Sequence, residues 1–123
     1  MNPIQAEQLT IQLAEKVLEW RLAPGRFIKA GRSWIPRWRF NPLTQIDDAF
    51  LLLDRARADF RLTGAGNGLF NAEVCVSRRS GRASGNERAR TITIALARAL
   101  GMQVPEDLTA PKLVQSRSGI DGI

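Results

Sequence analysis

The chain has 123 residues, 44% of them hydrophobic and 24% charged, which suffices for one domain with a hydrophobic core but not for two. It contains no histidine and a single cysteine, Cys75, so an internal disulfide, histidine-based catalysis and the usual structural zinc sites are excluded. No apolar run approaches the roughly 20 residues of a membrane span, and the first residues lack the pattern of a signal peptide. We therefore expect no membrane partner and a cytoplasmic location.

The net charge of +6 is unevenly distributed along the chain. Residues 21–39 hold six basic side chains and no acidic one, and residues 78–98 hold six basic side chains against one acid. A basic stripe is typical of a protein that binds a polyanion, whereas the simpler interpretation is that these arginines are only solvated. The candidate nucleic-acid-binding residues are Arg32, Arg37, Trp38, Arg39, Arg78, Arg79 and Arg82.

The first expected element is a helix over about residues 3–21. Asn2 followed by Pro3 is a typical helix start, and apolar residues then recur at helical spacing as far as Trp20. Pro24 and Gly25 end the pattern, and we expect Trp20 to anchor the core.

Residues 22–40 form a basic insert whose two halves, 26–29 and 34–36, could pair as a short ribbon. Arg37-Trp38-Arg39 alternates basic and aromatic residues, a pattern that suits stacking on bases beside phosphates. The alternative is that Trp34 or Trp38 folds back to cover the core. We favour this alternative, because a large aromatic side chain contributes much buried area to a small domain.

A second helix is expected over about residues 45–57, and we interpret it as the core helix. Thr44 is the predicted N-cap, with Asp47 reaching back to the first turn. Its apolar face is formed by Ile46, Ala49, Phe50 and Leu53.

Alternating residues then predict a central hairpin over about residues 59–77. Phe60 and Leu62 share one strand face, and the Asn67-Gly68 pair is a strong turn signal. We expect residues 77–83 to be a basic loop.

The third expected helix covers about residues 85–100. Ser84-Gly85-Asn86-Glu87 matches a capping box, and Gly101 suits the position after a helix. We therefore predict a domain over residues 1–102, followed by an extension over 103–123 that is partly disordered.

In this order, the segments resemble the phage ABA sandwich domain, a family of small phage and prophage proteins of unknown function. The resemblance rests on three blocks, 13–20, 41–50 and 89–101, with the hairpin between the last two. Phe50, where tryptophan is usual, the basic insert and the tail depart from it. The resemblance implies an α+β fold with an α-β-α layered sandwich, an antiparallel sheet, and an origin that places the protein in a bacterial host cell. It carries over no catalytic residue.

We expect a non-catalytic binding or adaptor module with an unknown protein partner, or alternatively a nucleic-acid-binding accessory protein. A metal-dependent nuclease needs clustered carboxylates and usually a lysine beside the attacking water. Asp59 and Glu73 fit this only superficially, since no lysine follows Glu73 on its strand. We therefore expect no enzyme, no catalytic or metal-binding residues and no cofactor; the oligomeric state stays open.

Overall fold

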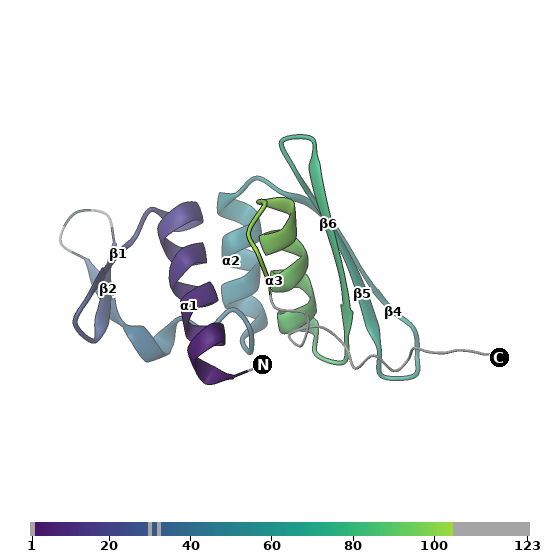
Figure 1. Cartoon of the computed structure of the whole chain (residues 1–123), viewed down its shortest axis with the longest axis horizontal. Coiled ribbons are helices and arrows are strands. Elements are labelled where there is room, and N and C mark those ends of the chain that lie inside the picture. The colour runs from purple at the N-terminus through teal and green to yellow at the C-terminus, as the bar shows by residue number, and fades with distance from the viewer. Residues whose placement is uncertain (1, 30, 32, 105–123) are drawn as a thin grey trace.

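The computed structural model describes residues 2–29, 31 and 33–104, and it confirms an α+β fold. The helices α1 (Pro3–Leu13), α2 (Ile46–Arg55) and α3 (Arg88–Ala99) lie side by side (Figure 1). A small antiparallel sheet is formed by β1 (Arg21–Ala23), β2 (Arg26–Ile28) and β3 (Trp34–Pro36). A larger antiparallel sheet is formed by β4 (Asp59–Gly64), β5 (Phe70–Val76) and β6 (Arg79–Gly85).

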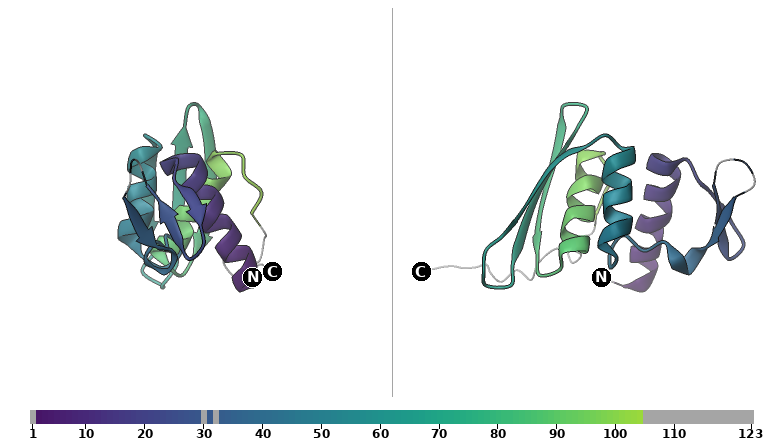
Figure 2. Two further views of the ribbon diagram at one scale, coloured as in Figure 1. Left: turned by 90° about the vertical axis from the view of Figure 1, so that its left-hand side faces the viewer. Right: turned by 180° about the vertical axis from the view of Figure 1, so that it is seen from behind.

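Helix α3 packs on one face of the larger sheet, α2 and then α1 lie beyond it, and the smaller sheet lies at the opposite end (Figures 1 and 2). The order of layers therefore differs from the expected α-β-α arrangement, because the helices lie between two sheets. The reason is that residues 21–36, treated as an insert in the sequence, form a sheet of their own. The predicted C-terminal extension lies almost entirely outside the described residues.

The most deeply buried element is α3, and not the helix that the sequence favoured. Nine of its residues are buried, including Ile92, Ile94 and Leu96, and it packs against β5 and β6. Its partner strand β6 presents only small residues to it, which are Gly81, Ala83 and Gly85. Helix α2 buries Ala49 and Leu53 of its predicted apolar face, together with Leu52. Phe50, expected on the same face, is instead 42% exposed.

Strand β6 was missed in the sequence, because residues 77–83 were expected to be a loop. Ser77 and Arg78 alone form the turn after β5, with φ values of 49° and 72°. The capping box at Ser84 is wrong: Ser84 lies in β6, and its hydroxyl donates to Asn71 Oδ1 across the sheet at 2.5 Å. Pairing with β5 keeps Ser84 and Gly85 extended, and helix α3 begins only at Arg88. Its N-cap, Glu87, makes no side-chain cap bond.

The cap expected at Thr44 is also absent. Gln45 is the N-cap of α2 and makes no side-chain cap bond. The carboxylate that reaches back belongs to Asp48, whose Oδ2 accepts from the Asn41 amide at 2.8 Å. The acidic first turn predicted from the sequence is therefore present. The residue that reaches back is Asp48 instead of the expected Asp47.

The first helix is shorter than predicted, although its start is confirmed. Asn2 and Gln5 form a reciprocal capping box at its N-terminus. After Leu13 the chain continues as a π-helix, η1 (Ala14–Leu18), and Glu19 leaves it with a φ of 60°. The left-handed conformation of Glu19 ends the helix before the predicted position 21 and directs the chain into β1.

Two further expectations at element ends are confirmed. The β4–β5 hairpin closes through Ala65–Leu69, with the Ala65 amide donating to the Leu69 carbonyl at 3.0 Å. Gly101 has a φ of 79° and directly follows the Leu100 C-cap of α3. The Met102 amide donates back to the Ala97 carbonyl at 3.0 Å, which completes a Schellman motif.

Candidate nucleic-acid interface

Two tryptophans are exposed at the end of the molecule that carries the smaller sheet. Trp34 on β3 is 54% exposed, and Trp38 in the 3₁₀ turn η2 (Arg37–Arg39) is 79% exposed. The expectation that one of them covers the core is therefore wrong. That position is filled by Trp20, Phe27 and Phe40, whose ring centroids lie 5.1–5.9 Å apart in one buried triangle.

The strand register places the exposed face of the smaller sheet. Phe27 of β2 faces the core, so its neighbours Arg26 and Ile28 face outward. Ile28 lies between Arg21 and Trp34 on the adjacent strands, and the guanidinium of Arg26 lies 5.4 Å from the centroid of the Trp34 ring. The outer face therefore combines one exposed aromatic ring with two exposed arginines.

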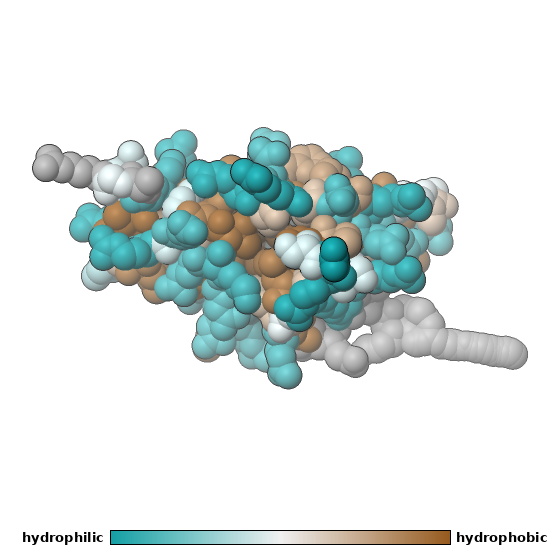
Figure 3. Space-filling model, turned by 90° about the horizontal axis from the view of Figure 1, so that it is seen from above, coloured by the Kyte–Doolittle hydropathy of each residue, from teal (hydrophilic) through white to brown (hydrophobic). Residues whose placement is uncertain are grey.

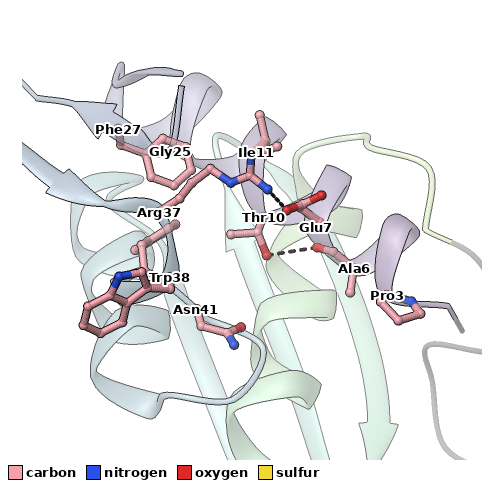
Figure 4. Close-up of a pocket in the computed structure, with 11 residues that line it drawn as sticks. Pro3, Ala6, Glu7, Thr10, Ile11, Gly25, Phe27, Arg37, Trp38 and Asn41 are labelled. Atoms are coloured by element: carbon pink, nitrogen blue, oxygen red, sulfur yellow. Dashed lines mark hydrogen bonds and ion pairs between the residues drawn. The ribbon is translucent and has the colours of Figure 1, made fainter. Parts of the chain in front are cut away.

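The predicted residues Arg37, Trp38 and Arg39 lie together on η2, beside this sheet. Arg37 forms an ion pair with Glu7 of α1 (Figure 4). Trp38 and Arg39 are exposed. A groove of about 490 Å³ separates η2 from α1. Figure 4 shows Arg37 reaching across this groove toward Glu7, while the Trp38 ring points away from α1.

The second predicted basic segment lies elsewhere in the structure. Arg78 is in the turn between β5 and β6, on the far side of the helices from η2 (Figure 1). The side chain of Arg79 lies against Gly101, and Arg82 bonds to Glu73 Oε2 at 2.9 Å. The structure therefore does not bring the two basic segments together. Arg32 lies outside the described residues.

Arg21, Arg26 and Trp34 were not among the candidates chosen from the sequence, although they form the outer face described above. The signal in the sequence for Arg21 and Arg26 was the basic run of residues 21–39, which contains no acid. The contact between Arg26 and Trp34 depends on the pairing of β2 with β3, which the sequence indicated only as a possible ribbon.

The described residues contain no group of three or more Cys, Asp or Glu side chains that could hold a metal ion. Glu73, one of the two carboxylates considered for a nuclease, is bound by Arg82. Within the same part of the chain, no helix is long and apolar enough to cross a membrane.

These elements define an α+β protein with three central helices, two antiparallel sheets and a basic, aromatic surface at one end. No protein-family model matches the sequence, and no curated protein matches it. Among solved structures, the fold is similar to that of a phage protein from Bacillus cereus ATCC 14579, with a TM-score of 0.66. The two chains are 14% identical over 85% of this chain and 95% of that one, so the likeness concerns the fold alone. Membership of the phage ABA sandwich family stays a prediction.

Proposed function

We propose that the protein is a phage- or prophage-derived binding module without catalytic activity, and that it binds single-stranded nucleic acid through the smaller sheet and η2. The similarity in fold to the Bacillus cereus phage protein supports the proposed origin. The exposure of Trp38 between Arg37 and Arg39 is the observation on which the proposed activity rests.

An exposed tryptophan loses the stabilisation that burial of its large ring would provide. Trp38 is nevertheless 79% exposed, and Trp34, on the adjoining strand, is 54% exposed. Each ring offers a flat face on which a base can stack, a contact worth about 1–3 kcal/mol per base. Single strands, whose bases are free to stack, therefore suit this surface better than duplexes do.

The charges around the rings suit a phosphate backbone. Residues 21–39 contain no acidic residue, and Arg21, Arg26 and Arg39 are all exposed. Among the described residues of this segment, only Arg37 is paired with an acid, Glu7, which comes from α1. Basic side chains beside stacking aromatics are the combination used for single strands without sequence preference.

The test is fluorescence anisotropy of labelled oligo(dT), oligo(rU) and a DNA duplex, titrated with the protein at several salt concentrations. We expect single strands to bind more tightly than the duplex, with affinity that falls as salt rises. Trp38→Ala should weaken single-strand binding by about 1–3 kcal/mol, whereas Trp38→Phe should retain most of it.

Two matched double variants separate the two basic segments, since each removes two positive charges. Arg26→Gln/Arg39→Gln should lower the slope of log K against log salt by about 1.4, if each arginine neutralises one phosphate of a single strand. Arg78→Gln/Arg82→Gln should leave the slope unchanged. The reverse result would move the site to the β5–β6 turn, and no binding at low salt would refute the proposal.

A protein partner is the second candidate, because the groove beside Trp38 is largely apolar. Its walls include Ala6, Ile11, Phe27 and Phe40. The space-filling view also shows hydrophobic patches exposed between hydrophilic side chains (Figure 3). If oligonucleotides do not bind, cross-linking from a photoreactive residue placed at Ala6 in host cells tests this adaptor function. Arg78 offers the matched control position, and cross-links to the same proteins from both positions would count against a groove-specific partner.

A further inference from the structure

Strand β4 lies at an edge of the larger sheet, and among residues 2–29, 31 and 33–104 it pairs with β5 alone. The hydrogen bond from the Ala65 amide to Leu69 shows which backbone groups face β5. Residues at alternate positions point the opposite way, so the amides and carbonyls of Phe60 and Leu62 face outward. No hydrogen bond within the described part of the chain satisfies these groups, so the edge can accept another strand.

An exposed aromatic pair lies beside this edge. Phe60 of β4 is 47% exposed and Phe50 of α2 is 42% exposed, with ring centroids 5.8 Å apart. They line a groove of about 520 Å³ between α2 and β4. Phe60 pairs with buried Val74, so its ring is on the helix-covered face of the sheet. An occupant of the edge would cover this pair.

The open face of the same strand carries two charges of opposite sign, Asp59 and Arg61. Neither makes an ion pair within the described residues. Arg61 lies opposite Glu73, but that carboxylate is bound by Arg82 on the other side. Both charges therefore remain available to a strand that adds to the edge.

We infer that the partner at this edge is a second copy of the chain, added with its own β4 antiparallel. The two sheets would then join into one continuous sheet across a two-fold axis. This proposal is independent of the nucleic-acid surface, which lies at the opposite end of the molecule (Figure 1).

Self-complementary charges select the register. With Phe60 opposite Phe60 of the second copy, each Asp59 lies opposite an Arg61, which forms two favourable cross-strand pairs. With Phe60 opposite Leu62, Arg61 would face Arg61. With Leu62 opposite Leu62, Asp59 would face Ala65 and no charge would be paired.

The same register uses the outward backbone groups and the exposed rings. In this register the Phe60 amide and carbonyl of each copy bond to those of the other copy. The Leu62 amide of each copy donates to the Ala58 carbonyl of the other copy. The Ala58 amide is already bonded to the Leu53 carbonyl at 3.0 Å, so only its carbonyl is needed. Phe50 and Phe60 of both copies meet on the helix side and cover one another.

Analytical ultracentrifugation of the full chain over a range of concentrations tests the proposal. We expect a monomer–dimer equilibrium in the unchanged protein. Asp59→Arg and Arg61→Asp should each shift the dissociation constant upward at least tenfold, since each places like charges opposite one another. Arg26→Asp, which makes the same charge change as Arg61→Asp at the other end of the molecule, should leave the equilibrium unchanged.

Mixing the Asp59→Arg variant with the Arg61→Asp variant provides a test that a folding defect cannot imitate. One variant carries arginine and the other aspartate at both positions 59 and 61, so every cross-strand pair in a mixed dimer is favourable. A 1:1 heterodimer should therefore form, and the double exchange Asp59→Arg/Arg61→Asp should restore the homodimer. A protein that stays monomeric at the highest soluble concentration, or a dimer that neither single reversal weakens, would overturn the proposal. So would the absence of the heterodimer when circular dichroism shows both variants folded.

Discussion

Gly81 of β6 lies against the backbone of Ala95 in α3, so closely that a side-chain carbon at position 81 would overlap the Ala95 carbonyl oxygen. The same carbon would meet the amide of Ala99 and, at 2.8 Å, the Cβ of Arg98. A glycine is therefore required at this contact, and it lets α3 approach the sheet more closely than any other residue would allow. The close packing of α3 on β6 depends on it.

Gly81→Ala should therefore destabilise the protein by about 1–3 kcal/mol or more, because the rigid backbone of α3 has to move away. Chemical denaturation followed by circular dichroism measures this. Gly64→Ala is the matched control on β4, where the nearest atom is 3.3 Å away on the Phe70 ring. That side chain can rotate, so the control should cost less than about 1 kcal/mol. Equal losses would show that close helix packing does not limit position 81.

Leu53→Ala should cost about 2–5 kcal/mol, as expected for truncation of a side chain that is 2% exposed in the core. Ile4 on α1 is 65% exposed, so Ile4→Ala should change the free energy of unfolding by less than about 0.5 kcal/mol. Urea denaturation of the two variants decides. A loss below half a kcal/mol for Leu53→Ala would mean that α2 does not bury this face.

The Thr93 hydroxyl donates to the Pro42 carbonyl at 2.8 Å and thereby ties α3 to the segment before α2. Thr93→Val should cost about 1–3 kcal/mol, since it leaves that buried carbonyl without the bond. Thr91 is equally buried, but its hydroxyl bonds to the Glu87 carbonyl, which also accepts from the Thr91 amide. Thr91→Val should therefore cost less. Thermal unfolding compares the pair, and the opposite order would contradict the importance of the Pro42 bond.

Substitutions at Ser84 distinguish a strand residue from a helix cap. At a cap, alanine costs about 1 kcal/mol and glycine only a few tenths. In β6 the order should reverse, because glycine weakens a strand through its conformational entropy, whereas alanine loses only the exposed bond to Asn71. Denaturation of Ser84→Ala and Ser84→Gly measures the order. A smaller loss for glycine would restore the capping box.

Local features of this protein could be predicted from the order of its amino acids. The spacing of apolar residues located α1 and α2, and alternation located β4 and β5. The glycine after α3 marked its end, and Trp20 was correctly placed in the core. These features depend on backbone preferences and on periodicity within a few residues, so they can be recognised without knowledge of distant partners.

Features that depend on contacts between distant segments could be recognised only in the folded chain. Ser84 could satisfy either a helix start or a strand, and pairing with β5 selected the strand. Trp38 could have covered the core, but Trp20, Phe27 and Phe40 already fill that space. Arg26 meets Trp34 only because β2 and β3 pair. In each case several local solutions have similar free energies, and the packing of the whole chain selects among them.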